Sequence, residues 1–240
     1  MPFGNDFCKR FHFDFRPFFD YNDNDITKED IPMFTGFSND DFEVFSVPGL
    51  DARMEKLIEL IRPKLNMLGA DFAPQLSILC GEEMFSHVAK HARRTVNPPK
   101  DTWVAWAKNK RGYKALPHFQ IGLWGTHVFI QFTIIYECTN KQVFAENLKN
   151  HKIPLYRLVP GHYYWSMDHT KPEVNKVSSL DESSIDTITQ KLLNNKNAEF
   201  LCGLQINNDD PILTDGAKFY RLVEETFETL LPLYQMSFES

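Results

Sequence analysis

The sequence predicts a single α+β domain in which helices pack mostly on one face of a largely antiparallel sheet of about five strands. Three observations lead to this class: a tight β-hairpin, apolar residues at helical spacing near both ends of the domain, and the absence of internal repeats or low-complexity linkers. The chain has 240 residues, of which 42% are hydrophobic and 24% charged. These proportions suit one packed core and argue against wholesale disorder.

An unusual N-terminal segment precedes this domain. Residues 1–36 hold eight of the chain's 21 phenylalanines. Charged residues such as Lys9 and Asp14 interrupt every apolar run, so the segment does not read as a secretory signal. We expect a Phe-rich extension that is either disordered or docked through its phenylalanines, followed by a single domain over 37–240.

Helices are predicted where apolar residues recur at i, i+3, i+4 and i+7. This spacing holds over residues 51–66 and over residues 215–234, which indicates two helices with one buried face each. Asp215 or Thr214 is suited to cap the second of them, and Pro232 lies near its expected end. Shorter helices are predicted at 142–148 and 182–193.

The central element is a hairpin of residues 118–123 and 128–133. Its two-residue loop, Gly125-Thr126, favours a type II′ turn. Pairing across this turn places Phe119 opposite Phe132 on an apolar face, and His118, Gln120, Gln131 and Thr133 together on a polar face. Further strands are predicted at 102–107, 163–167 and 198–206.

Positive charge is concentrated between residues 81 and 120. Eight Lys or Arg stand against three acidic residues there, within a chain whose formal net charge is −6. Such segregation suits an anionic partner. Read as a helix, residues 85–94 place four donors on one face, where Arg can bind phosphate or carboxylate bidentately. Trp103 and Trp106 interleave with the charges, a pattern typical of nucleotide or single-strand binding. The candidate phosphate-binding residues are His87, Lys90, His91, Arg93, Arg94, Lys110, Arg111, Tyr113, His118 and Gln120.

Several alternatives remain beside this binding hypothesis. The basic face could simply be solvated, or it could bind another protein as a non-catalytic regulator. An enzyme acting on a phosphorylated small molecule would use His118 or His169 as general acid–base and Asp168 as the orienting carboxylate. His87 and His91 have metal-ligand spacing, but no Glu follows His87 and the neighbouring charges repel a cation, so neither a metal nor a cofactor is predicted.

Composition also bears on location. No run approaches the roughly 18 uncharged apolar residues of a membrane span. Cys8, Cys80, Cys138 and Cys202 are too scattered for a disulfide framework, and three of them lie in apolar runs, as packing residues do in a reducing compartment. We therefore expect a cytoplasmic protein without a membrane partner. The sequence leaves its oligomeric state open.

A family resemblance rests on several runs of residues. They are 49–54, 61–65, 87–94, 97–105, 109–114, 117–122, Asp168-His169 with Lys171-Pro172, and 222–234. From about residue 37 to the end, the chain resembles the YktB-like family of uncharacterised bacterial proteins, also called domain of unknown function 1054. The resemblance implies a small cytoplasmic α+β protein whose sheet is grouped with the synthetase and biotin-ligase core. Such a fold analogy implies no reaction.

Overall fold

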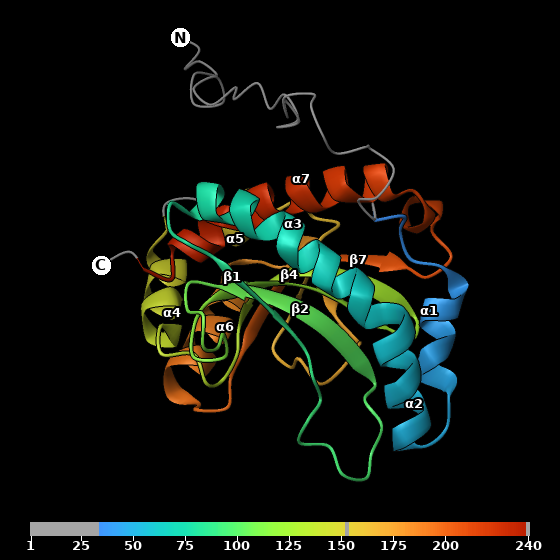
Figure 1. Cartoon of the computed structure of the whole chain (residues 1–240). Helices are drawn as coiled ribbons and strands as arrows, with labels where there is room; N and C mark the ends of the chain where they lie inside the picture. Colours follow the sequence, from blue (N-terminus) through green and yellow to red (C-terminus); the bar gives the residue numbers. More distant parts are fainter. Residues whose placement is uncertain (1–33, 152–153, 239–240) are drawn as a thin grey trace. The chain divides into compact units, whose positions relative to one another are not determined.

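The computed structural model describes residues 34–151 and 154–238. The described residues form a seven-stranded sheet in the order β1-β2-β3-β4-β7-β5-β6, in which every neighbouring pair is antiparallel (Figure 1). The predicted α+β class is confirmed, with two strands more than the five expected. The strands are β1 (Phe85–Val88), β2 (Asp101–Ala107), β3 (His118–Trp124), β4 (His127–Ile134), β5 (Tyr164–Ser166), β6 (Asn175–Lys176) and β7 (Phe200–Asn207).

The hairpin of β3 and β4 has the predicted register. Phe119 pairs with Phe132 and Gln120 with Gln131, so the apolar and polar faces separate as the alternation requires. The predicted type II′ turn is wrong, because that turn needs a positive φ at its first loop residue and Gly125 has none. Gly125 instead makes room: a Cβ there would lie 3.2 Å from the Cβ of Phe45.

Two long helices cover the apolar face of the sheet. They are α3 (Arg62–Cys80) and α7 (Gly216–Gln235), which lie side by side across the strands (Figure 1). The predicted helix over 51–66 corresponds to α2 (Leu50–Lys56), a π-turn (Leu57–Ile61) and the start of α3, and it continues 14 residues further, through Pro74. The carbonyl of Gly69 in α3 accepts a hydrogen bond from Trp106 Nε1 at 3.0 Å, which ties the helix to β2.

The remaining helices join the same layer or the edges of the sheet. Phe144 of α4 packs on Phe132 and Phe200, with ring centroids 5.7 and 5.1 Å apart, so α4 also lies on the apolar face. The predicted N-cap of α7 is Asp215, whose carboxylate accepts from Lys218 N at 3.0 Å. The shorter helices are α1 (Asn39–Glu43), α4 (Lys141–Asn150), α5 (Leu155–Leu158) and α6 (Glu182–Asn194).

The predicted helix over 85–94 is wrong. Phe85–Val88 form the edge strand β1, which pairs with β2, and a loop follows in which His91 has a φ of +52°. Strand pairing satisfies the backbone of this short segment, and the left-handed residue prevents a helix from continuing. The four donors assigned to one helix face, His87, Lys90, His91 and Arg94, therefore share no such face.

At the N-terminal end, the described chain starts with a residue that is already packed. Phe34, which the sequence assigned to the extension, is buried with its ring 5.3 Å from that of Phe37 and 5.5 Å from that of Phe219. The expectations for the first 33 residues lie outside the described part of the chain. Within the described part, no helix is both long enough and apolar enough to cross a membrane.

Candidate functional site

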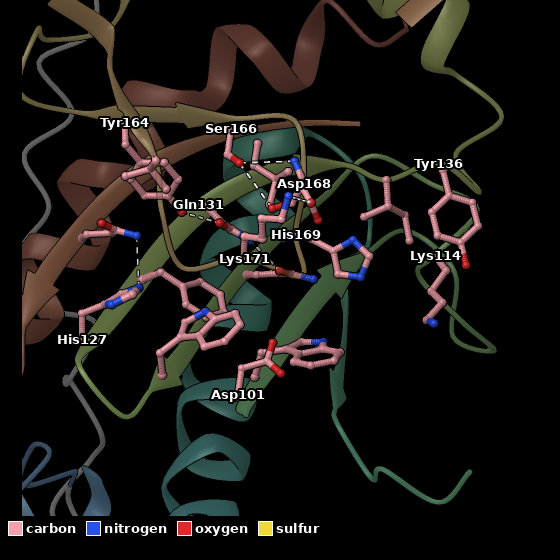
Figure 2. Close-up of a pocket in the computed structure, with 18 of the residues that line it drawn as sticks. Asp101, Lys114, His127, Gln131, Tyr136, Tyr164, Ser166, Asp168, His169 and Lys171 are labelled. Carbon is pink, nitrogen blue, oxygen red and sulfur yellow. Dashed lines mark hydrogen bonds and ion pairs between the residues drawn. The ribbon is translucent and has the colours of Figure 1, made fainter. Parts of the chain in front are cut away.

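The polar face of the sheet, opposite α3 and α7, carries a pocket that we call the sheet pocket. It encloses about 80 Å³ and is open to solvent at its mouth, so a ligand of ordinary size would lie partly outside it. Buried amides form its floor, aromatic rings line it, and charged groups surround its mouth (Figure 2). The lining includes Gln120 and Gln131 on the floor, Trp103, Tyr113, Phe129 and Tyr164 along the sides, and Asp101, Lys114, Asp168, His169 and Lys171 at the mouth.

A chain of hydrogen bonds crosses the floor. Tyr164 donates its hydroxyl to Gln131 Oε1, and Gln131 Nε2 donates to Gln120 Oε1 at 2.7 Å. Gln120 Nε2 lies 3.0 Å from His118 Nε2, and His118 Nδ1 lies 2.7 Å from the carbonyl oxygen of Leu116. All four side chains are buried. The face that the sequence identified as polar is therefore an internally hydrogen-bonded layer beneath the pocket.

Two glycines let neighbouring side chains lie across this face of the sheet. Gly203 lies between Gln131 and Tyr164 in the sheet register, and a Cβ on it would lie 2.7 Å from the Cβ of Gln131. Tyr164 can therefore reach across β7 to Gln131. At Gly122, a Cβ would lie 2.3 Å from the ring of Phe129. The absence of a side chain at Gly122 and at Gly203 thus helps to shape the pocket.

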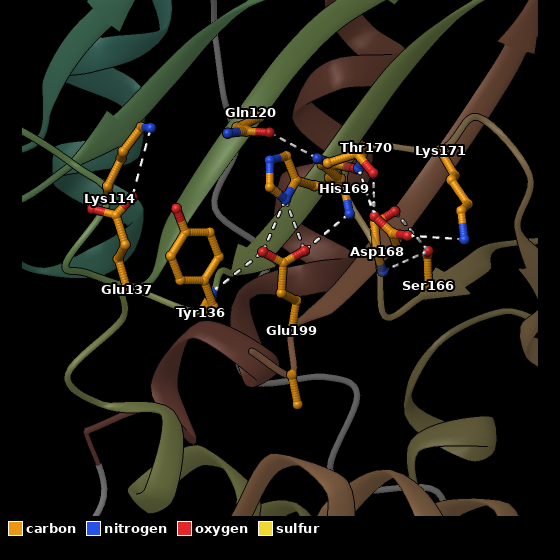
Figure 3. Close-up of polar contacts among 12 residues, drawn as sticks. Lys114, Gln120, Tyr136, Glu137, Ser166, Asp168, His169, Thr170, Lys171 and Glu199 are labelled. Atoms are coloured by element: carbon orange, nitrogen blue, oxygen red, sulfur yellow. Dashed lines mark hydrogen bonds and ion pairs between the residues drawn. The ribbon is translucent and has the colours of Figure 1, made fainter. Parts of the chain in front are cut away.

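His169 is held at the mouth by a buried carboxylate. Glu199 is 3% exposed, and it accepts from the His169 backbone N–H at 2.9 Å and from His169 Nδ1 at 2.8 Å (Figure 3). The hydrogen bond to Glu199 raises the pKa of His169. This geometry leaves the other ring nitrogen, Nε2, for the pocket, because no partner for it occurs among the described residues. The arrangement resembles the general pattern of a carboxylate that orients a functional histidine.

Two aspartates add negative charge to the same mouth. Burial raises the pKa of Asp101 to about 6, although the nearby cations Arg94 and His169 oppose the shift. Asp168 instead accepts from the backbone and hydroxyl of Thr170 at 2.9 and 2.6 Å, and these bonds lower its pKa. Asp101 is therefore the carboxyl group that can take up or release a proton near neutral pH.

The cations at the mouth are accessible. Lys171 pairs with Asp168 at 3.2 Å and Lys114 pairs with Glu137 at 3.7 Å, with lysine side chains 67% and 52% exposed. Pairs this exposed contribute little to stability. Either ammonium group can exchange its carboxylate partner for a ligand anion.

The structure separates the predicted phosphate-binding residues into two groups. Tyr113 and Gln120 line the sheet pocket, and the buried His118 lies below it, with its ring centroid 4.9 Å from that of Tyr113. The ring of His87 lies tilted beside that of Tyr113, with centroids 5.5 Å apart, and the ring of His91 packs edge-on against Trp103. The others, Lys90, Arg93, Arg94, Lys110 and Arg111, are exposed on the loops that follow β1 and β2, outside the pocket lining.

The candidate acid–base residues also occupy different environments. His118 is fully buried, both its ring nitrogens have partners, and burial lowers its pKa to about 4. Asp168 bonds to Thr170 and Lys171, and the group that orients His169 is Glu199. Adjacent residues such as Asp168 and His169 project in different directions, whereas Glu199 approaches the histidine from the start of β7.

Several residues of the site were not predicted from the sequence. They are Glu199, which holds His169, and the pocket residues Tyr164, Asp101 and Lys171. For one of them a signal existed: parity along the predicted strand 198–206 places Glu199 on the same face as Gly203. No comparable pattern points to Tyr164, because its pairing partner follows it by 39 residues.

Comparison with known proteins gives one family. The model of a domain of unknown function, DUF1054, matches residues 37–234. A UPF0637 protein of Bacillus velezensis is 49% identical over 201 residues, which are 84% of this chain and 96% of the relative. UPF0637 proteins of Bacillus licheniformis and Bacillus cytotoxicus are 49% and 48% identical, over 84% and 83% of this chain and 95% and 96% of their own lengths.

Proposed function

We propose that this chain, which belongs to the DUF1054 (UPF0637) family, binds a small phosphate-bearing molecule in the sheet pocket. One observation carries the proposal: accessible cations and a protonatable histidine surround the mouth of a pocket with aromatic sides. Ammonium groups and imidazolium bind phosphate through charge-assisted hydrogen bonds. Aromatic rings and a few placed polar groups are typical of small-molecule sites.

A pocket suits a small molecule better than a long nucleic acid strand. Nucleic acid binding requires a continuous basic surface and depends steeply on salt. Here the five exposed basic residues lie on two loops beside the pocket, and Asp101 and Asp168 contribute negative charge to its mouth. The formal net charge of −6 also opposes binding to a polyanion.

Calorimetric titration with inorganic phosphate, ribose 5-phosphate and AMP tests the proposal. We expect the wild-type chain to bind at least one of them, and Lys171→Ala and Lys114→Ala each to weaken binding by about tenfold, because each removes one charge-assisted contact. Lys149→Ala, on an exposed lysine of α4 outside the pocket lining, is the matched control. Failure of all three probes to bind, or an equal loss in the control variant, would contradict the proposal.

A second candidate function is catalysis on the bound phosphate ester. It is favoured by His169, whose ring is fixed by the buried Glu199 while Nε2 is left for the pocket. A histidine held in this way is suited to general acid–base chemistry, which contributes about 10²–10⁴-fold to a rate. If the pocket is catalytic, p-nitrophenyl phosphate is hydrolysed by the wild-type chain, and His169→Asn reduces kcat by that factor. No turnover by the wild-type chain would reject this candidate while leaving the binding proposal intact.

A further inference from the structure

The hydrogen-bond chain on the pocket floor has a fixed direction at one end. The carbonyl oxygen of Leu116 can only accept, so His118 Nδ1 carries the hydrogen of that contact. Burial keeps His118 neutral, with its pKa lowered to about 4. Its Nε2 therefore accepts, and the amide nitrogen of Gln120 is the donor to it. This contact also fixes which end of the Gln120 amide is nitrogen.

The other end of the chain is fixed by a hydroxyl group. Burial raises the pKa of Tyr164, so the phenol keeps its proton and donates it to Gln131 Oε1. The oxygen of Gln131 therefore faces Tyr164, and its nitrogen faces the oxygen of Gln120. Both amides are thus held in one orientation by groups that cannot reverse their roles at neutral pH.

Each glutamine then has hydrogen-bonding capacity left over. An amide has two N–H donors and two acceptor lone pairs, and the chain uses one of each in Gln120 and in Gln131. The described residues supply no partner for the second N–H of either amide. Both side chains line the sheet pocket and are nonetheless buried. Because buried donors left unpaired are costly, these N–H groups are suited to pair with whatever fills the pocket, water or ligand.

Aromatic rings lie two residues along the strands from this amide pair. The Gly122–Phe129 pair follows the Gln120–Gln131 pair on the same face, and Trp103 is the neighbour of Gly122 on β2. Because Gly122 has no side chain, Phe129 and the first carbon of Trp103 come within 2.3 and 2.7 Å of where its Cβ would be. Flat apolar faces therefore border the pair of amides, as Figure 2 shows for the pocket as a whole.

We propose that the sheet pocket takes a nucleotide, whose base pairs edge-on with Gln120 and Gln131 and whose phosphate lies at the Lys114–Lys171 mouth. The inference rests on the proposed phosphate-binding function and names the class of molecule bound. Glutamine amides pair with the edges of bases because both present a donor beside an acceptor. Aromatic side chains favour the face of any base. A sugar phosphate offers neither a flat ring nor such an edge.

Calorimetric titration with matched ligands tests the inference. Ribose 5-phosphate is compared with AMP, GMP, CMP and UMP, which add only a base to it. We expect at least one nucleotide to bind tenfold or more tightly than ribose 5-phosphate, a difference of about 1.4 kcal/mol. In Gln131→Met and Gln120→Met, which keep the side-chain length, we expect this preference to disappear while ribose 5-phosphate binds as in the wild-type chain.

Each outcome separates the two proposals. If ribose 5-phosphate and the nucleotides bind equally well to the wild-type chain, the base is not recognised and the inference is overturned, although phosphate binding stands. If inorganic phosphate, ribose 5-phosphate and the nucleotides all fail to bind, both proposals fail. Retained ribose 5-phosphate affinity in the variants shows that the pocket is folded, and Gln190→Met, at an exposed residue of α6, is the matched control. A variant that keeps the full nucleotide preference also overturns the inference.

Discussion

Replacing Asp101 with Asn is expected to stabilise the domain near neutral pH. Burial raises the pKa of this carboxyl group from 3.8 to about 6, so the folded chain holds the proton more tightly than the unfolded chain. The difference, at about 1.4 kcal/mol for each pH unit, sets an upper limit of about 3 kcal/mol. Because the side chain is partly exposed, solvent screening reduces the expected gain to about 1–2 kcal/mol.

The pH dependence of this gain is its signature. Because folding raises the pKa of this carboxyl group, its protonated form stabilises the folded chain. This stabilisation is complete below about pH 4 and is lost as the pH rises through about 6. Asp101→Asn cannot lose it, so the variant should exceed the wild-type chain in free energy of unfolding at about pH 7.5 and lose most of that excess at about pH 4. Urea unfolding followed by circular dichroism measures both conditions.

A control and a clear refutation accompany this measurement. Asp209→Asn, in the exposed turn after β7, removes the same charge away from the pocket and should leave the unfolding midpoint nearly unchanged. A gain of equal size at both pH values would show that packing, not charge burial, is responsible. No gain at about pH 7.5 would mean that Asp101 is solvated well enough to ionise freely.

Three further predictions concern the site and the sheet. Glu199→Gln should lower the pKa of His169, because the hydrogen bond that favours the imidazolium loses its charge, and an NMR titration of the ring that gives the wild-type value would refute this role. Ile121→Ala should cost about 2–5 kcal/mol in urea unfolding, whereas Ile58→Ala, 47% exposed, should cost far less; equal costs would contradict the register. Gly203→Ala should lower the unfolding midpoint and abolish nucleotide binding, since its Cβ would lie 2.1 Å from a carbonyl oxygen of β4; unchanged calorimetry would exclude a role for this glycine in shaping the pocket floor.

The hairpin was predictable because its information is local. Alternation along β3 and β4 distinguishes the two faces, and a two-residue loop then leaves one register. The conformation of the loop was not predictable in the same way. Gly125 lies against Phe45, eighty residues earlier, and the residues around the loop give no indication of that contact. The same limit applies to burial: the polar face is recognisable by parity, but its coverage by Tyr164 is not.

The helices show how tertiary contacts override local patterns. A helix over 85–94 would place four donors on one face, yet this segment is an edge strand and a loop because β2 offers a pairing partner. Conversely, Pro74 does not end α3, which packs along β1 and β2 and continues as a helix to Cys80. At the site, His169 and Glu199 are 30 residues apart, so only the pairing of β5 with β7 brings their neighbourhoods together.

The position of β7 in the sheet has a consequence for the order in which the site assembles. In the sequence, β4, β5 and β6 come before β7, yet β7 lies between β4 and β5 in the sheet. Contacts between segments far apart in sequence form slowly, so we expect the insertion of β7 to be a late folding step. Gln131 of β4 and Tyr164 of β5 join only across that strand. A molecule that binds this pocket therefore binds only chains in which β7 is already in place. By mass action, it stabilises the complete sheet relative to chains in which β7 is not paired.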